Sequence, residues 1–368
     1  MLSTERTGAR TQRASIAACI ALAMVAALGA PAAATSTTAR GPSTTTDPYV
    51  LPVADGVHIT SLLTVNDAGA ASNGYEMVGV PDGLGIMRQG ANLVLYMNHE
   101  LRDAQGIVRR HGQTGAFDSR WVIDPVTLRV KEGSDFINPG VLYWDYPSSH
   151  YVTTGARFAN SALQDRTFGR FCSGTLSDPG VFYNAATKTG WKGQIYFANE
   201  EDGDVGRSFG VTKEGNATAL PRLGLFSWEN TKPAHNTTRT TLVMGDEDGP
   251  GDGSQEFVYI GRKQRSGSPV AKAGLTNGSL YVIDAVNEAV STDAQWRAAY
   301  GKTAQPVDLG SVNWNQAGAA LNVQAKAQGR VDPESWTHGS AKSRVQWFLA
   351  GYREGTLDAC DTFAAGAL

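Results

Sequence analysis

The sequence predicts an all-β protein folded as a β-propeller, complete or incomplete, with a few inserted helices. Short apolar segments rich in β-forming residues recur along the chain, and turn signals separate them. Glycine is abundant, at 42 of 368 residues, and aromatic residues are also plentiful. Long amphipathic helical patterns are few. Together these observations favour a chain of many short strands joined by tight turns.

A propeller is favoured over a sandwich because so many short strands exceed what one sandwich holds, and because blades place strand ends around a central channel. Turn signals include Pro81-Asp82-Gly83 and Asn277-Gly278. Two helices are expected, at Asp293–Tyr300 and Gln316–Gln328. The predicted strands are Tyr75–Val80, Leu93–Met97, Trp121–Val130, Gln194–Ala198, Phe209–Thr212, Thr241–Met244, Glu256–Gly261 and Ser279–Ile283.

The N-terminus reads as an export signal over residues 1–34. Basic residues precede an alanine-rich apolar run, and Ala32-Ala33-Ala34 offers a cleavage site. A linker rich in Thr, Ser, Gly and Pro is expected over 35–47, a β domain over 48–330 and a divergent tail over 331–368. No other segment is long and apolar enough to cross a membrane. The mature protein is therefore expected to be secreted or periplasmic.

Charge and cysteine content exclude some classes of function. The net charge of -3 and the lack of a Lys/Arg run predict no nucleic-acid partner. Only Cys172 and Cys360 remain after signal removal, too few for a disulfide scaffold. They either form one disulfide or remain thiols that are buried or bound to metal.

Three apolar runs each end in acidic and amide residues. A buried strand presents such a cluster at one edge of its sheet, where several strands can converge. Converging carboxylates repel one another unless cations neutralise them, so convergence predicts hard metal ions such as Ca²⁺. The alternative is that each cluster is a solvated turn. The clusters are Asn98-His99-Glu100, Asn199-Glu200-Glu201-Asp202 and Gly245-Asp246-Glu247-Asp248.

Two further residues could contribute to a metal site. Cys172 lies upstream of the second acidic cluster, and its thiolate would favour soft or borderline metals, so that iron could lie beside calcium. The alternative is a buried structural cysteine. Glu229 is flanked by aromatic and apolar residues, so its carboxylate either faces water or is buried with a partner. The chain has no H-E-x-x-H zinc motif and no P-loop.

Six motifs in series resemble the PhoX-type alkaline phosphatases, a family of secreted bacterial β-propeller metallophosphatases. The likeness covers about residues 55–329. The motifs are Asn98-His99-Glu100, Cys172-Ser173-Gly174-Thr175-Leu176, Asn199-Glu200-Glu201, Phe226-Ser227-Trp228-Glu229-Asn230, Gly245-Asp246-Glu247-Asp248 and the strand Glu256–Ile260.

The resemblance implies hydrolysis of small phosphate monoesters at a mixed calcium and iron cluster. It implies that Cys172 bridges the irons. The implied carboxylate ligands are Glu200 or Glu201, Glu229, Glu100 and Asp246.

The chain departs from the family after the second predicted helix. There the family has an Arg-x-Glu-Asp-Gly segment that binds phosphate, whereas this chain has Arg330-Val331-Asp332-Pro333-Glu334. If this stretch is a degenerate version of the family segment, Arg330 is the expected phosphate-binding residue. The alternative is that the tail is truncated or frameshifted. The alternative functions are a non-catalytic calcium-stabilised propeller that acts as a binding module, and a phosphodiesterase- or phytase-like variant.

Overall fold

The computed structural model describes residues 35–153, 167–235, 238–247, 255–285, 293–301, 307–312 and 314. The chain divides into two compact units. The described part of the first unit holds β1 (Thr37–Arg40) and β2 (His58–Ser61), which pair in parallel. Strand β1 therefore falls within the segment expected to be a linker.

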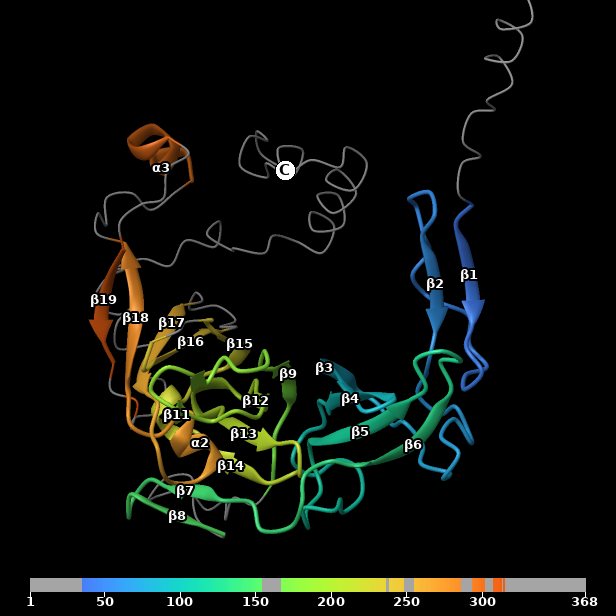
Figure 1. The fold of residues 1–368 in the computed structure, drawn as a ribbon, viewed down its shortest axis with the longest axis horizontal. Helices are drawn as coiled ribbons and strands as arrows, with labels where there is room; N and C mark the ends of the chain where they lie inside the picture. Colours follow the sequence, from blue (N-terminus) through green and yellow to red (C-terminus); the bar gives the residue numbers. More distant parts are fainter. Residues whose placement is uncertain are drawn as a thin grey trace, which may run out of the picture. The chain divides into compact units, whose positions relative to one another are not determined.

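The described part of the second unit contains three antiparallel sheets of four or five strands, each built mainly from strands that follow one another in the chain (Figure 1). The first sheet has the order β3 (Pro81–Gln89), β4 (Asn92–His99), β5 (Phe117–Ile123), β6 (Val130–Asp135). The second has the order β9 (Phe171–Leu176), β12 (Ile195–Glu200), β13 (Ser208–Thr212), β14 (Ala217–Ala219). The third has the order β15 (Trp228–Pro233), β16 (Thr240–Glu247), β17 (Glu256–Arg262), β18 (Ser279–Ala285), β19 (Val307–Ser311).

The remaining elements are short. Two small hairpins are formed by β7 (Tyr143–Asp145) with β8 (His150–Val152), and by β10 (Tyr183–Asn184) with β11 (Thr189–Gly190). The helices are α2 (Pro269–Lys272), α3 (Asp293–Tyr300) and two 3₁₀ turns at Gly203–Val205 and Pro221–Leu223. Among the described residues, no helix has the length and apolar character needed to span a bilayer. The prediction of an all-β chain with few helices is confirmed.

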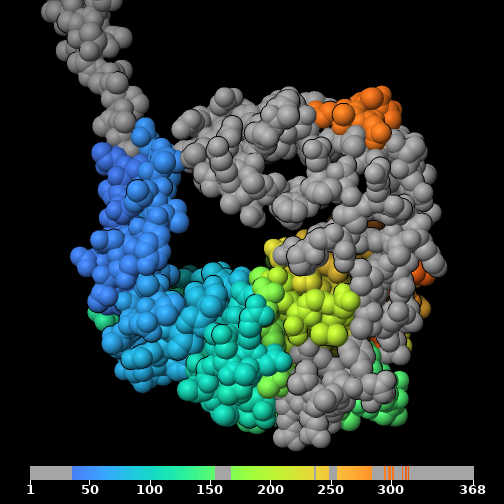
Figure 2. Space-filling model, turned by 180° about the vertical axis from the view of Figure 1, so that it is seen from behind, coloured from blue at the N-terminus to red at the C-terminus, as the bar shows by residue number. Residues whose placement is uncertain are grey.

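The three sheets are arranged like propeller blades. The first strands of the sheets, β3, β9 and β15, lie next to one another, with β9 in the middle. From behind, the surface of the first sheet, cyan to teal, adjoins that of the second, green to yellow-green (Figure 2). In a propeller the first strand of each blade lies nearest the axis, so these three strands occupy the place where strand ends converge.

Aromatic side chains fill the space between the sheets. Between the first and second sheets, the ring of Tyr96 in β4 lies against that of Tyr196 in β12, with centroids 5.5 Å apart. Between the second and third sheets, Phe197 of β12 belongs to the same buried cluster as Phe226 and Phe257, whose rings stack at 4.4 Å. Rings of this size bury large apolar areas and dominate core stability. The aromatic residues counted in the sequence therefore hold neighbouring sheets together.

Two glycines allow β3 and β9 to approach closely. A Cβ atom on Gly83 would lie 1.9 Å from the backbone nitrogen of Gly174, and one on Gly174 would lie 2.2 Å from the Tyr196 hydroxyl. A side chain at position 83 would force the backbone of β9 to move, and one at position 174 would force the buried Tyr196 ring to move. Gly83 directly follows Asp82, and Gly174 lies two residues after Cys172. The contact between the glycines therefore also sets the distance between the Asp82 and Cys172 side chains.

Replacing Gly83 by alanine is expected to lower the free energy of unfolding by about 3 kcal/mol, because overpacking against backbone atoms forces strands apart. Urea unfolding followed by circular dichroism measures the change. Arg88→Ala, at an exposed position of β3, is the matched control and should change stability by less than about 0.5 kcal/mol. Equal stability of Gly83→Ala and the parent protein would contradict the close approach.

The structure corrects two predicted strands. Residues 75–80 form no strand, and β3 begins at Pro81, where the sequence indicated a turn. The strand predicted at Trp121–Val130 is interrupted after Ile123, where the Asp124 carboxylate accepts hydrogen bonds from the backbone N–H groups of Val126 and Thr127.

Other predicted elements agree with the structure or lie outside it. The predicted strands at 93–97, 194–198, 209–212, 241–244, 256–261 and 279–283 fall on β4, β12, β13, β16, β17 and β18. The helix Asp293–Tyr300 is confirmed as α3. The predicted helix Gln316–Gln328 lies outside the described residues.

Candidate metal centre

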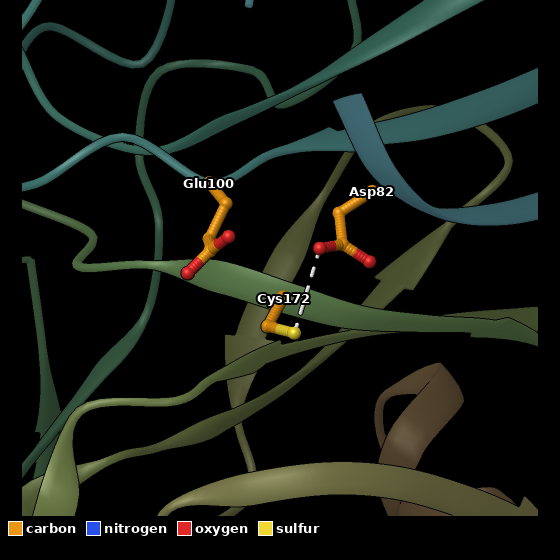
Figure 3. A group of neighbouring side chains, drawn as sticks. All are labelled: Asp82, Glu100 and Cys172. Atoms are coloured by element: carbon orange, nitrogen blue, oxygen red, sulfur yellow. Dashed lines mark hydrogen bonds between the residues drawn. The ribbon is translucent and has the colours of Figure 1, made fainter. Parts of the chain in front are cut away.

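A cysteine and four carboxylates meet at one end of the three adjacent strands. Asp82, Glu100 and Cys172 form one group, and Cys172, Glu201 and Glu229 form a second. Within each group, ligand atoms lie within 4.8 Å of one another. Figure 3 shows the first group, with both carboxylates close to the Cys172 sulfur. Cys172 belongs to both groups and carries a free thiol.

The five side chains come from the first two strands of each of two sheets and from the first strand of the third. Asp82, Cys172 and Glu229 lie near the starts of β3, β9 and β15. Glu100 and Glu201 directly follow the ends of β4 and β12. Since β4 and β12 run antiparallel to β3 and β9, the end of the second strand meets the start of the first. Sheet topology therefore brings residues distant in sequence to one edge.

The pairing register is interrupted where β3 and β9 carry their site residues. In the first sheet, Asp82 and Gly83 together oppose Asn98. In the second sheet, residues 172–173 together oppose Asn199. Two residues facing one define a β-bulge, which turns a side chain away from the normal alternation. Asp82 and Cys172 thus project from equivalent irregularities in neighbouring sheets.

The third sheet has a bulge at the equivalent position. Asparagine side chains link the three sheets. Glu229 is the extra residue at the register shift between β15 and β16. Asn98 donates from Nδ2 to the Ser173 carbonyl at 2.8 Å. Asn199 donates from Nδ2 to Ser173 Oγ at 2.8 Å and to Thr231 Oγ1 at 2.7 Å. Each asparagine is buried and ties its own sheet to the next, so the three bulges are held in fixed relation.

Arg170 pairs with two of the site carboxylates. Its Nη2 lies 2.7 Å from Glu100 Oε1 and 2.9 Å from Glu201 Oε2. Its Nη1 also donates to the Glu201 carbonyl at 2.9 Å. Arg170 has a positive φ of 43°. Such a conformation is costly for a residue with a side chain and concentrates at functional sites. The guanidinium therefore orients Glu100 and Glu201 beside Cys172.

Burial and negative charge set the protonation of the central thiol. Burial raises the pKa of the Cys172 thiol, and the Asp82, Glu201 and Glu229 carboxylates raise it further. The thiol hydrogen-bonds to Asp82 Oδ2 with an S···O distance of 3.5 Å. Burial also raises the pKa of Asp82, although this hydrogen bond and Arg170 oppose the rise. A cation at Cys172 would reverse the balance, because it stabilises both thiolate and carboxylate.

Glu200 points away from this centre and forms a buried ion pair. Its Oε1 lies 2.7 Å from Arg207 Nη2, and its Oε2 accepts from Arg207 Nε at 2.7 Å. The backbone N–H groups of Gly169 and Arg207 donate to the two oxygens at 3.0 Å each. The Glu200 side chain is fully buried. Of the two neighbouring glutamates in the sequence motif, the structure therefore brings Glu201, and not Glu200, to Cys172.

The other candidate residues lie apart or outside the description. Asp246 is in β16 opposite Asn230 and Glu256, at the same edge of the third sheet, and belongs to neither group. Arg330 lies outside the described residues. The sequence reasoning missed Asp82, which it read as part of a turn, and Arg170. Their proximity to Cys172 arises from the bulges and from the contact of β3 with β9.

The donor set suits metal ions of two kinds. A thiolate binds soft or borderline ions such as iron or zinc, whereas carboxylate oxygens bind hard ions such as calcium. Cys172 lies between an Asp82–Glu100 pair and a Glu201–Glu229 pair, so both donor types are present within one centre. The residues therefore fit a thiolate-bound ion with further ions held by carboxylates.

Comparison with known families matches a short segment near the C-terminus. Residues 309–363 match the Zn_peptidase family, described as "Putative neutral zinc metallopeptidase". An uncharacterized protein of Mycobacterium tuberculosis is 50% identical over 46 residues, which are 12% of this chain and 16% of that protein. The uncharacterized protein YpfJ of Escherichia coli K12 is 40% identical over 53 residues, 14% of this chain and 18% of that protein. The chain thus spans less than a fifth of the length of these relatives.

One solved structure is similar to part of this chain. It is Pseudomonas fluorescens PhoX in complex with vanadate, a transition state analogue, and the sequence identity is 10%. The alignment covers 57% of this chain and 46% of that chain, with a TM-score of 0.36. The likeness is remote. The metallopeptidase match begins inside β19 and includes most of the tail predicted over 331–368.

Proposed function

We propose that this protein is an exported metal-dependent phosphatase that hydrolyses small phosphate monoesters at the Cys172 centre. One observation carries the proposal: Cys172 meets four carboxylates from three sheets at a single point. The six sequence motifs that resemble PhoX-type phosphatases support it, since Glu100, Cys172, Glu201 and Glu229 all come from them. Export is proposed from the signal sequence over residues 1–34.

We propose that iron and calcium occupy the centre. Cys172 with Glu201 and Glu229 would hold iron, and Asp82 and Glu100 would hold calcium, in accord with the softness of each donor. When bound, such cations neutralise the non-bridging oxygens of a phosphate ester and activate water. The bulges of β3, β9 and β15 position the ligands, and Arg170 keeps Glu100 and Glu201 from rotating away.

Arg330 remains part of the proposal as the residue that contacts the substrate phosphate. The guanidinium suits this role because its fork matches two phosphate oxygens. Arg170 is a positioning residue, since its Nη2 already contacts the Glu100 and Glu201 carboxylates and its Nη1 donates to the Glu201 carbonyl. Glu200 is assigned to the fold and not to the metals.

A second candidate is a non-catalytic propeller that binds calcium for stability. The four carboxylates around Cys172 favour it, because oxygen ligands alone suffice for calcium. The two candidates differ in the metal they require: a structural calcium site has no need of the Cys172 thiolate. A third candidate is a peptidase with zinc at Cys172. The metallopeptidase match over residues 309–363 is the reason to test peptide hydrolysis.

The test is elemental analysis of the mature protein purified without added metal, with assays on p-nitrophenyl phosphate, its bis-ester and a casein substrate. We expect iron and calcium together, monoester hydrolysis that EDTA abolishes, and recovery when both metals return. Monoester hydrolysis that is insensitive to chelation would overturn the proposal. Calcium alone, without hydrolysis, would indicate the binding module. Faster hydrolysis of the bis-ester would indicate a diesterase. Bound zinc together with casein cleavage would indicate a peptidase.

A further inference from the structure

A large cavity lies at the far end of the second sheet from the metal centre. Its volume is about 740 Å³, and its lining includes Leu176, Gln194 and Tyr196. Cys172 lies at the start of β9 and Leu176 at its end, about 13 Å along the strand at the usual rise per residue. None of the five side chains of the metal centre lines the cavity. The cavity is therefore a separate feature.

The rim of the cavity is strongly cationic. Five basic side chains and one acidic side chain, Glu214, line it, although the whole chain carries a net charge of -3. Within the described residues, the one ion pair among these six groups joins Lys213 Nζ to Glu214 Oε1, at 3.7 Å between exposed side chains. A local excess of positive charge in a concave surface attracts anions. The basic residues are Lys188, Lys192, Lys213, Arg265 and Lys272.

Two of these cations are held by aromatic rings instead of by carboxylates. Lys192 Nζ lies 5.0 Å from the centroid of the Tyr183 ring. Lys272 Nζ lies 4.6 Å from the centroid of the Trp191 ring. A ring face holds an ammonium group without neutralising its charge. Both lysines are thus positioned at the rim and keep their full charge for a ligand.

The floor of the cavity is apolar. Tyr96, Phe136, Tyr196 and Val211 contribute to it and are buried, and Leu176 is half-buried beside them. These residues belong to the packing between the first and second sheets, so the floor is part of the rigid core. A ligand that reaches the floor would bury apolar surface there, while its charged groups stay at the rim.

We propose that this cavity is a binding site for a small organic polyanion, with an apolar or aromatic body on the floor and two or more phosphate or sulfate groups at the cationic rim. The volume suits a ligand of nucleotide size. Cations held over aromatic rings select charge without demanding one geometry. The site is independent of the metal centre and of the phosphatase proposal.

Binding of a fluorescent pyrene trisulfonate to the full-length mature protein tests the site. The double variant Lys188→Glu/Arg265→Glu should bind the dye at least about tenfold more weakly, since each exposed charge contributes roughly a few-fold and reversal adds repulsion. Both side chains are exposed, so the fold should persist, as circular dichroism would verify. Lys232→Glu reverses an exposed charge outside the cavity and should change affinity less than about twofold.

Two further arms separate this site from the metal centre and identify the ligand chemistry. Cys172→Ala should bind the dye as the parent protein does, whatever happens to its metal content. Adenosine triphosphate should displace the dye more strongly than inorganic tripolyphosphate if phosphate is the favoured charged group and the floor holds the ligand body. If sulfated disaccharides displace the dye most strongly, the site is assigned to sulfate ligands. Equal affinity of the double variant and the parent, or tripolyphosphate binding as tightly as the dye, would overturn the proposal.

Discussion

Replacing Cys172 by alanine is expected to remove iron from the purified protein and to lower monoester hydrolysis by at least about a hundredfold. Removing a residue that only hydrogen-bonds to a metal ligand typically lowers metal affinity or activity about 10- to 100-fold. Removing Cys172 should have a larger effect, because it belongs to both ligand groups. Elemental analysis and kcat/KM for p-nitrophenyl phosphate measure the two effects. Calcium should persist in part, because the carboxylate pairs remain.

Two controls make this result specific. Glu132→Gln removes an exposed acidic group of β6, and it should leave metal content and rate unchanged. Circular dichroism should show that Cys172→Ala remains folded, since the thiol is only half-buried. Retention of iron and of full activity by Cys172→Ala would contradict the assignment of the thiolate as a ligand.

Glu200→Gln is expected to lower the free energy of unfolding by about 3–5 kcal/mol, because it removes the charge of the carboxylate that pairs with the buried Arg207 guanidinium. The Arg207 side chain is 7% exposed, so water cannot replace the lost carboxylate. Urea unfolding at pH 7 measures the loss. Metal content per folded molecule should stay the same, because Glu200 does not belong to either ligand group.

The exposed pair Lys213–Glu214 provides the matched comparison. Its side chains are 59% and 53% exposed, and Glu214→Gln should cost less than about 0.5 kcal/mol. Glu201→Gln is the complementary variant, expected to lose metal with a smaller effect on stability. If Glu200→Gln lost metal while its stability stayed unchanged, the roles of Glu200 and Glu201 would be reversed.

The sequence predicted the all-β class and the arrangement of acidic strand ends, because both depend on local patterns. Leu93–Met97 and Gln194–Ala198 are apolar runs that end at the site edge, and the structure has β4 and β12 there. The sequence could not choose between Glu200 and Glu201. That choice depends on side-chain alternation, and the bulge opposite Asn199 resets it.

The innermost strands were harder to recognise. β9 and β15 carry polar residues and site residues on short segments, FCSGTL and WENTKP, that lack the apolar alternation of a strand. β3 contains Asp82-Gly83, which is also a turn signal. A strand that lines a functional site carries ligand residues at positions where other strands carry apolar residues. The apolar alternation that identifies a strand is therefore missing at such a site. Asp82 was missed for this reason.

Arg170 was missed for a different reason. Its contacts with Glu100 and Glu201 join residues separated by 70 and 31 positions, and no local pattern encodes them. The cavity rim is similar, since its five cations come from separated parts of the chain and disappear in the overall charge. Overall composition argued against a basic surface, whereas folding concentrates basic residues locally.

The distribution of the ligands over three sheets makes metal occupancy a cross-link of the fold. An ion held by Cys172, Glu201 and Glu229 joins the second and third sheets, and one held by Asp82, Glu100 and Cys172 joins the first and second. By mass action, an ion at one hundred times its dissociation constant adds about 2.7 kcal/mol to the folded state. Scarcity of metal would then act first on the docking of whole sheets, and the supply of metal ions would govern how long the protein stays folded.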